Sequence, residues 1–345
     1  MNAVTPIKGS SARPRLPLVR LELFLPFIQE LDQRRLDADS LLRQHGLVRA
    51  SVNDPNLFIS VNVIHKMLED CAGISGDPYF ALHVGEQLDV SRWSPLIDAA
   101  TRASSLGDFL TRFILAATED ASSVTQALEV KGVYTFFREQ RISEPTVTPS
   151  QNDAFTAAYM LSILKNAAGA HWDARAVLLQ VSDPDALPKG YQGIQIAGGD
   201  NRGMSVRFPT EWLTYDIERQ GFISPASFPA NRTHPPGSFL EALWLTLSPR
   251  LGSDELSVDH VAHLLGLGRQ TLQRRLKVYD TSLTKELMQL KQQHAIEALV
   301  HTGQAVAEIG ESLGFQSPAS FTRAFKSWTG QSPRDYRKAH RRDVS

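Results

Sequence analysis

Over about the last 100 residues, apolar side chains recur at helical spacing in short runs separated by glycine. Val258 and Val261 would lie on one face of a first helix, which Gly266 ends because glycine readily adopts the left-handed backbone that closes a helix. A second amphipathic helix is expected over 269–279. Two short helices joined by a tight glycine turn are the pattern of a helix-turn-helix unit.

The same unit returns further along the chain. Leu265-Gly266-Leu267 corresponds to Leu313-Gly314-Phe315 with an offset of 48, and 272–277 corresponds to 321–326 with an offset of 49, so the second turn is one residue longer. A single hairpin would fit a plain helical bundle. Aligned glycines, apolar anchors and arginines in two copies instead predict a double helix-turn-helix domain.

A helix expected over 284–300 separates the two copies. Its 17 residues would span about 25 Å. A rigid spacer of that length can hold two recognition helices about one DNA turn, roughly 34 Å, apart. Both helices would then enter successive major grooves on one face of a duplex.

The pattern before residue 222 is mixed, which predicts an α+β fold followed by an all-helical domain. Apolar residues at helical spacing are found over 18–31, 61–72 and 106–117, and further helices are expected over 150–168 and 210–218. Strand patterns are found over 126–138, around the turn at Lys131-Gly132, and over 174–182 and 204–208. Four prolines within 222–238 exclude a regular helix or central strand and indicate a linker. The expected organisation is a disordered arm over 1–17, a sensing or dimerisation domain over 18–221, the linker, and a DNA-binding domain over 239–342.

Net charge is −1 over the 345 residues, which alone argues against a nucleic-acid partner, but the charge is unevenly distributed. Residues 254–345 hold 13 basic and 10 acidic side chains; 269–277 hold four basic and none acidic, and 323–342 hold seven basic and one acidic. Concentrated positive charge is what neutralising phosphates requires. The charge distribution by itself fits a solvent-exposed helix face equally well.

The outward positions of the second helix in each unit are the candidate contacts to double-stranded DNA. Arginine can pair with guanine and glutamine with adenine in the major groove. In the second copy Ser317 is expected to cap the helix, Pro318 to be its first residue, and Phe321 and Phe325 to be buried. Base reading is assigned to Arg269, Gln270, Gln273, Arg274, Ala319, Thr322 and Arg323, with Ser317 at the helix start, and phosphate contact to Lys277, Lys326, Arg334 and Arg337.

The run Leu-Gly-Phe-Gln-Ser-Pro-Ala-Ser-Phe-Thr-Arg-Ala-Phe-Lys from Leu313, followed by Gly-Gln-Ser-Pro at 330–333, closely resembles the signature of the AraC/XylS family of bacterial regulators. The N-terminal part resembles the domain called arabinose-binding in ornithine and virulence regulators, through Ile74-Ser75-Gly76-Asp77-Pro78, Ser104-Ser105-Leu106-Gly107-Asp108 and Val206-Arg207-Phe208-Pro209. The resemblance implies a transcription activator, autorepressing in some members, that works with RNA polymerase. It also implies an N-terminal domain that senses a small molecule or forms a homodimer.

Three positions depart from the family pattern. Gly268 and Asp280 stand where a serine cap and a turn glycine are usual, and Gly310 replaces an alanine within a packed helix. Glycine in a helix interior costs about 1 kcal/mol relative to alanine. We therefore expect a looser second unit and unequal affinities for the two half-sites.

Effector sensing is expected from the family likeness alone. Aromatic side chains suggest where an effector pocket would lie, although aromatics in strands are more often core residues. The candidate lining is Tyr134, Phe136, Phe137, His171 and Trp172. The alternative left open is an N-terminal domain that pairs two chains and binds no metabolite.

Other functional classes lack their signatures. His260 and His263 share a helix face, but no third metal ligand accompanies them. The glycine-rich segment 198–203 lacks the Lys-Ser/Thr of a phosphate loop, and the chain has no Gly-x-Ser-x-Gly motif of a hydrolase. We therefore expect no enzyme activity, no metal site and no cofactor. Cys71 is the single cysteine, which excludes a disulfide within the chain. No apolar run is long enough to cross a bilayer, so we expect no membrane partner and a cytoplasmic, nucleoid-associated protein.

Overall fold

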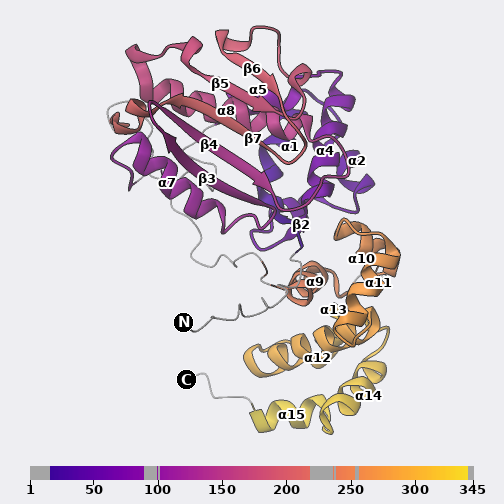
Figure 1. Cartoon of the computed structure of the whole chain (residues 1–345). Helices are drawn as coiled ribbons and strands as arrows, with labels where there is room; N and C mark the ends of the chain where they lie inside the picture. Colours follow the sequence, from indigo (N-terminus) through magenta and orange to yellow (C-terminus); the bar gives the residue numbers. More distant parts are fainter. Residues whose placement is uncertain are drawn as a thin grey trace, which may run out of the picture.

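The computed structural model describes residues 16–88, 99, 102–217, 236, 238–252 and 256–340. An N-terminal body of helices and strands is followed by a C-terminal body of helices (Figure 1). The predicted fold class is therefore confirmed. Of the arm expected at 1–17 only Leu16 and Pro17, and of the linker expected at 222–238 only Pro236 and Ser238, lie within the described residues.

Helices cover one face of the main N-terminal sheet. This five-stranded sheet has the order β3-β4-β7-β5-β6, in which only the β5–β6 pair is parallel. Its strands are β3 (Val124–Lys131), β4 (Tyr134–Arg141), β5 (Leu178–Val181), β6 (Gln195–Gly198) and β7 (Gly203–Pro209). The helices are α1 (Leu25–Gln33), α2 (Ala38–Gln44), α3 (Arg49–Val52), α4 (Val61–Ser75), α5 (Phe80–Glu86), α7 (Leu106–Ala117) and α8 (Ser150–Ala168).

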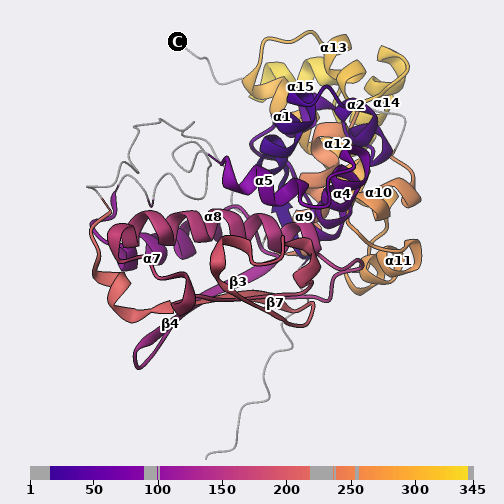
Figure 2. The ribbon, with the colours of Figure 1, turned by 90° about the horizontal axis from the view of Figure 1, so that it is seen from above.

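Helix α8 forms the centre of this body, lying along the sheet in Figure 2. It is buried on nearly all sides, because α4 and α5 pack against the face that the sheet leaves free. Asp153 of α8 is buried and pairs with the guanidinium of Arg141 at the end of β4. The same carboxylate accepts hydrogen bonds from the Ser182 backbone N–H at 2.9 Å and hydroxyl at 2.6 Å. Helix and sheet are thus joined by a buried charge as well as by apolar packing.

The helices expected over 61–72, 106–117 and 150–168 are confirmed as α4, α7 and α8, and the expected hairpin as β3–β4. Three other expectations were right only in part. Residues 18–31 begin with a strand, β1 (Leu18–Arg20), and a 3-10 turn, η1 (Leu21–Phe24), because β1 pairs with the distant β2 (Phe58–Ser60). The helix expected over 210–218 is only the short 3-10 turn η6 (Thr210–Thr214), and the strand expected over 174–182 covers only β5, after the 3-10 turn η3 (Ala174–Ala176).

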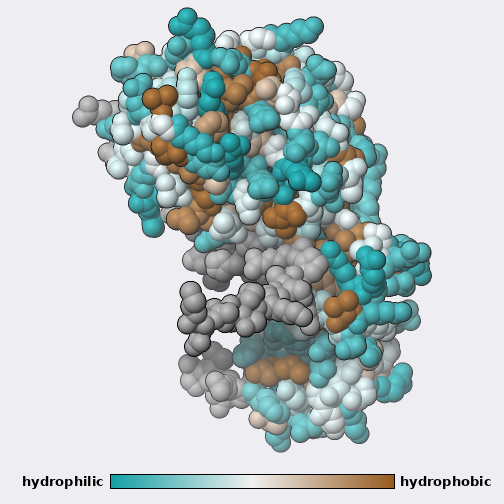
Figure 3. Space-filling model, in the orientation of Figure 1, coloured by the Kyte–Doolittle hydropathy of each residue, from teal (hydrophilic) through white to brown (hydrophobic). Residues whose placement is uncertain are grey.

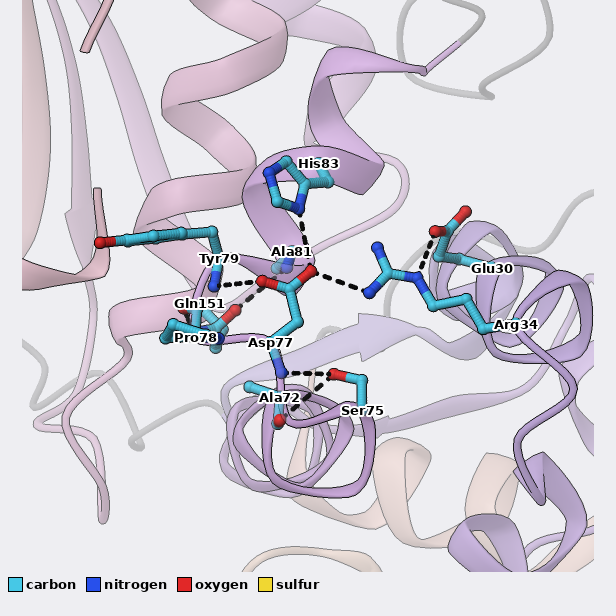
Figure 4. Close-up of polar contacts among 10 residues, drawn as sticks. All are labelled: Glu30, Arg34, Ala72, Ser75, Asp77, Pro78, Tyr79, Ala81, His83 and Gln151. Carbon is cyan, nitrogen blue, oxygen red and sulfur yellow. Dashed lines mark hydrogen bonds and ion pairs between the residues drawn. The ribbon is translucent and has the colours of Figure 1, made fainter. Parts of the chain in front are cut away.

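The Ile74–Pro78 motif holds three helices together (Figure 4). The Asp77 carboxylate accepts from Arg34 Nη1 at 2.8 Å, from the Tyr79 N–H at 2.9 Å, and lies 2.9 Å from His83 Nδ1. Gln151 of α8 donates to the Pro78 carbonyl at 2.7 Å and accepts from the Ala81 N–H at 3.0 Å. The motif is therefore structural, linking α1, α5 and α8.

The C-terminal body contains only helices among its described residues. They are α9 (Phe239–Leu247), the 3-10 turn η8 (Ser248–Arg250), α10 (Val258–Leu264), α11 (Arg269–Val278), α12 (Leu283–His301), α13 (Val306–Ser312), α14 (Pro318–Thr329) and α15 (Pro333–His340).

The β1–β2 ribbon connects the two bodies. Leu18 and Phe58, both 0% exposed, belong to the core of the helical domain together with Leu16, whereas Ile59 on the opposite face belongs to the N-terminal core. Fully burying a leucine or phenylalanine contributes about 1.5–3 kcal/mol. The contact between the domains is therefore a substantial apolar interface, and it begins before the expected boundary at residue 18.

Candidate nucleic-acid interface

The first helix-turn-helix unit is α10, a tight turn, and α11. The Ser257 hydroxyl caps α10 by accepting from the His260 N–H at 3.2 Å. Gly266 has φ +61°, the left-handed conformation that the sequence predicted there. Leu272 and Leu276 are buried, which fixes the rotation of α11 about its axis. The opposite face of α11 consequently points to solvent.

Every residue predicted to contact DNA from α11 is exposed on that face: Arg269, Gln270, Gln273, Arg274 and Lys277. The surface over α10 and α11 is mostly hydrophilic (Figure 3). Arg275 points inward instead, with its guanidinium 5.8 Å from the centroid of the Phe239 ring. Arg269 Nη1 lies 2.6 Å from Asp259 Oδ2 in an exposed ion pair, which contributes little stability and can exchange for a phosphate or base.

The second unit is α13, a turn, and α14. The Ser317 hydroxyl accepts from the Ser320 N–H at 3.2 Å and Pro318 is the first residue of α14, as predicted. Phe321 and Phe325 are both 0% exposed. Of the predicted contacts, Ser317, Ala319, Arg323 and Lys326 are exposed and Thr322 is half-buried.

The two predicted phosphate contacts on α15 differ. Arg334 is exposed. Arg337 is half-buried, and donates from Nε to the Leu299 carbonyl at 3.2 Å and from Nη2 to the Gln304 carbonyl at 2.6 Å. These carbonyls lie at the end of α12 and just beyond it, where a cation also complements the helix dipole. Arg337 therefore has a structural role that the sequence did not reveal.

Helix α12 holds the two units in a fixed relation. Its 19 residues span about 28 Å. Buried Glu286 accepts from Trp244 Nε1 of α9 and from the Thr281 hydroxyl, each at 2.5 Å, which locks α12 onto the first unit. The sequence did not predict the buried role of Glu286, because a glutamate on a helix is usually a surface residue. In both views α11 and α14 lie on the same side of the domain (Figures 1 and 2).

Two family models match the regions just described. "Helix-turn-helix domain" matches residues 261–339, and "Arabinose-binding domain of AraC transcription regulator, N-term" matches residues 36–194. The chain belongs to the AraC family of transcriptional regulators. As a member of that family, this regulator binds DNA through its helix-turn-helix domain.

Named relatives agree with this assignment. The regulator is 23% identical over 327 residues to HTH-type transcriptional regulator VirS of Mycobacterium tuberculosis, covering 88% of this chain and 92% of VirS. It is 25% identical over 123 residues to Transcriptional activator NphR of Rhodococcus sp, covering 36% of each chain. The crystal structure of transcriptional regulator CdpR from Pseudomonas aeruginosa matches with a TM-score of 0.38 and 17% identity, over 92% of this chain and 98% of CdpR. VirS and NphR are both named as transcriptional regulators or activators, the class predicted for this chain.

The family departures have structural consequences. Asp280 adopts φ +53°, the left-handed conformation for which glycine is usual, and Gly268 begins α11 without a side-chain cap. Gly310 packs directly on Phe321: a Cβ at position 310 would lie 2.9 Å from the Phe321 Cβ. Glycine at position 310 therefore lets α13 approach α14 closely, which the sequence did not reveal, while the looser second unit stays a prediction.

We expect Gly310→Ala to lower the free energy of unfolding by about 1 kcal/mol, since overpacking by about 1–3 kcal/mol outweighs the gain in helix propensity of about 1 kcal/mol. Urea unfolding of the full chain measures this. Gly303→Ala is the control, because nothing lies within 4 Å of an added Cβ there. A Gly310→Ala protein more stable than the parent would contradict the close packing.

The five residues expected to line an effector pocket lie in three separate places. Tyr134 and Phe136 are on the sheet face opposite α8, where Arg207 stacks 4.5 Å from the Tyr134 ring and Arg138 4.9 Å from the Phe136 ring. Phe137 is fully buried against Phe113. His171 contacts Tyr215, and Trp172 contacts Trp212, beyond the end of α8. The structure therefore does not bring them together as one pocket.

Within the described ranges, no helix is long and apolar enough to cross a membrane. Across the same residues no group of three or more histidine, cysteine or acidic side chains could hold a metal ion. His263, weighed as a metal ligand, is exposed and stacks on His45 of the N-terminal domain with ring centroids 6.1 Å apart.

Proposed function

We propose that this regulator binds promoter DNA by placing α11 and α14 in successive major grooves. The observation that carries the proposal is that both helices lie on the same side of the domain, bury their apolar anchors and expose their predicted DNA contacts, apart from the half-buried Thr322. Arg269, Gln270, Gln273 and Arg274 would read bases in one half-site, and Ala319, Thr322 and Arg323 in the other. Lys277, Lys326 and Arg334 would contact phosphates, with Ser317 at the helix start.

We further propose that the regulator activates transcription, as the name Transcriptional activator NphR states for that relative. It would do so together with RNA polymerase and under the control of a small-molecule effector. The N-terminal domain supports sensing because its core holds a cavity lined by polar as well as apolar side chains. The alternative is that this domain only pairs two chains. A chain that dimerises with rising concentration while no small molecule alters its thermal stability would favour that alternative.

Arg274→Ala is expected to cost about 1–3 kcal/mol of operator affinity and to relax base preference at one position. Lys326→Ala should instead weaken specific and random DNA alike and lower the salt slope by about one. Fluorescence anisotropy on an operator selected from genomic DNA, with a scrambled duplex beside it, measures both effects. Equal losses on the two duplexes for both variants would show that base and phosphate contacts have been assigned wrongly.

A further inference from the structure

The N-terminal domain holds a partly open cavity of about 110 Å³ between α1, α4, α7, α8 and the first strands of the sheet. Most of its wall is apolar, and includes Leu23, Phe24, Phe27, Ile64, Phe113 and Phe155. An apolar cavity of about 150 Å³ holds benzene, so this smaller, partly open cavity has room for no more than one six-membered ring.

One end of the cavity is polar and incompletely hydrogen-bonded. His65 is 2% exposed, and its Nδ1 has no hydrogen-bond partner within the described part of the chain. Gln126 donates from Nε2 to Glu139 Oε2 at 2.9 Å, whereas its buried Oε1 is likewise unpartnered there. Leaving a buried polar atom unpaired costs about 1–3 kcal/mol. A ligand that pairs these atoms would therefore gain affinity from them.

The charges at this end favour a cation. Burial lowers the pKa of His65 to about 3, so the imidazole is neutral. Arg20 and Asp120, which also line the cavity, pair with each other at 2.5 Å. Glu139 forms no ion pair with any described residue, and burial raises the pKa of its carboxyl, while the charge of nearby Arg141, which pairs with Asp153, acts in the opposite direction. A bound ammonium would favour the ionised form of Glu139 and pair with it directly, in surroundings where the pairing is little screened.

We propose that this cavity is the effector site and that it takes a small single-ring primary amine, whose ammonium pairs with Glu139 and whose ring lies against the apolar wall. The inference rests on the proposed effector sensing and adds the site and the class of ligand.

The cavity shares its walls with the contact between the domains. Val19 and Arg20 of β1 and Val61, Ile64 and His65 of α4 line it. The next residues along the same two elements, Leu18 and Ser60, meet the DNA-binding domain: Leu18 lies in its core, and Ser60 lies against Gly266 in the first helix-turn-helix. A ligand that moves β1 or α4 thus acts directly on the position of α10 and α11.

Three probes of matched shape test the proposal on the full chain by isothermal titration calorimetry: benzylamine, toluene and benzoate. We expect benzylamine to bind at least about tenfold more tightly than toluene, and benzoate not to bind, because only the amine pairs with Glu139. Glu139→Gln, nearly equal in shape, should weaken benzylamine about tenfold and leave toluene unchanged, which also shows that the cavity is intact. Glu129→Gln, on the open face of the same sheet, is the control and should change neither.

Benzylamine should also change the affinity of the full chain for its selected operator by about fivefold or more. Benzylamine binding no tighter than toluene, equal losses in the Glu139 and Glu129 variants, or binding without any change in operator affinity would overturn the proposed effector site. DNA recognition is tested separately, because the Arg274→Ala and Lys326→Ala results do not depend on any probe.

Discussion

Asp153→Ala is expected to lower the free energy of unfolding by about 3–5 kcal/mol, because it leaves the buried Arg141 guanidinium without its partner. The side chains of Asp153 and Arg141 are 1% and 3% exposed. The substitution also removes the acceptor of the two Ser182 hydrogen bonds, which tie the end of β5 to α8. Urea unfolding of the full chain, followed by circular dichroism, measures the loss.

A double variant separates charge pairing from packing. In Asp153→Leu with Arg141→Met both charges are gone, so we expect a much smaller loss than for Asp153→Ala alone. An exposed pair serves as the reference: Arg49→Ala removes ion pairs to Asp32 and Asp39 at the surface and should cost less than about 1 kcal/mol. A double variant as unstable as Asp153→Ala would mean that the loss comes from packing and not from an unpaired charge.

Local signals account for what the sequence predicted well. The N-cap Ser317, the proline after it and the buried Phe321 and Phe325 are all decided by residues within one helix, and the structure places them as expected. The second unit repeats the first, so the rotation of α14 could be inferred from that of α11. The helices α7 and α8 were likewise predicted with their observed bounds, α7 from an uninterrupted apolar periodicity.

Contacts between distant parts of the chain account for the features that the sequence did not predict. The segment that starts at Leu18 has apolar residues at helical spacing, but Leu18–Arg20 pairs as a strand with Phe58–Ser60, some 40 residues away. The cavity could not be found from the sequence either, since His65, Gln126 and Glu139 come from a helix and two strands that only the fold brings together. The cavity is lined by other aromatic residues than those chosen from the sequence, such as Phe24 and Phe155. Phe137 is instead buried in the core.

Gly266→Ala is expected to destabilise the chain by about 2–5 kcal/mol, the sum of two costs. Alanine in the left-handed conformation costs about 1–2 kcal/mol. The added Cβ would also overlap the Ser60 hydroxyl and lie 2.7 Å from the Ser60 Cβ, at an overpacking cost of about 1–3 kcal/mol. Urea unfolding measures the total, and operator binding should weaken as well because this turn sets the angle between α10 and α11.

The overpacking against Ser60 arises at the contact between the two domains, so a double-mutant cycle can separate it from the backbone cost. Ser60→Gly removes the overlapping atoms and costs only a few tenths of a kcal/mol, because glycine is tolerated as a helix N-cap. Added to Gly266→Ala it should restore about 1–3 kcal/mol and leave the backbone cost in place. Gly268→Ser, two residues further along the same turn, has open space around it and should be neutral or slightly stabilising. If Ser60→Gly restores none of the stability lost in Gly266→Ala, the start of α4 does not contact the first helix-turn-helix unit. The proposed coupling between the cavity and the DNA-binding helices would then lack its structural basis.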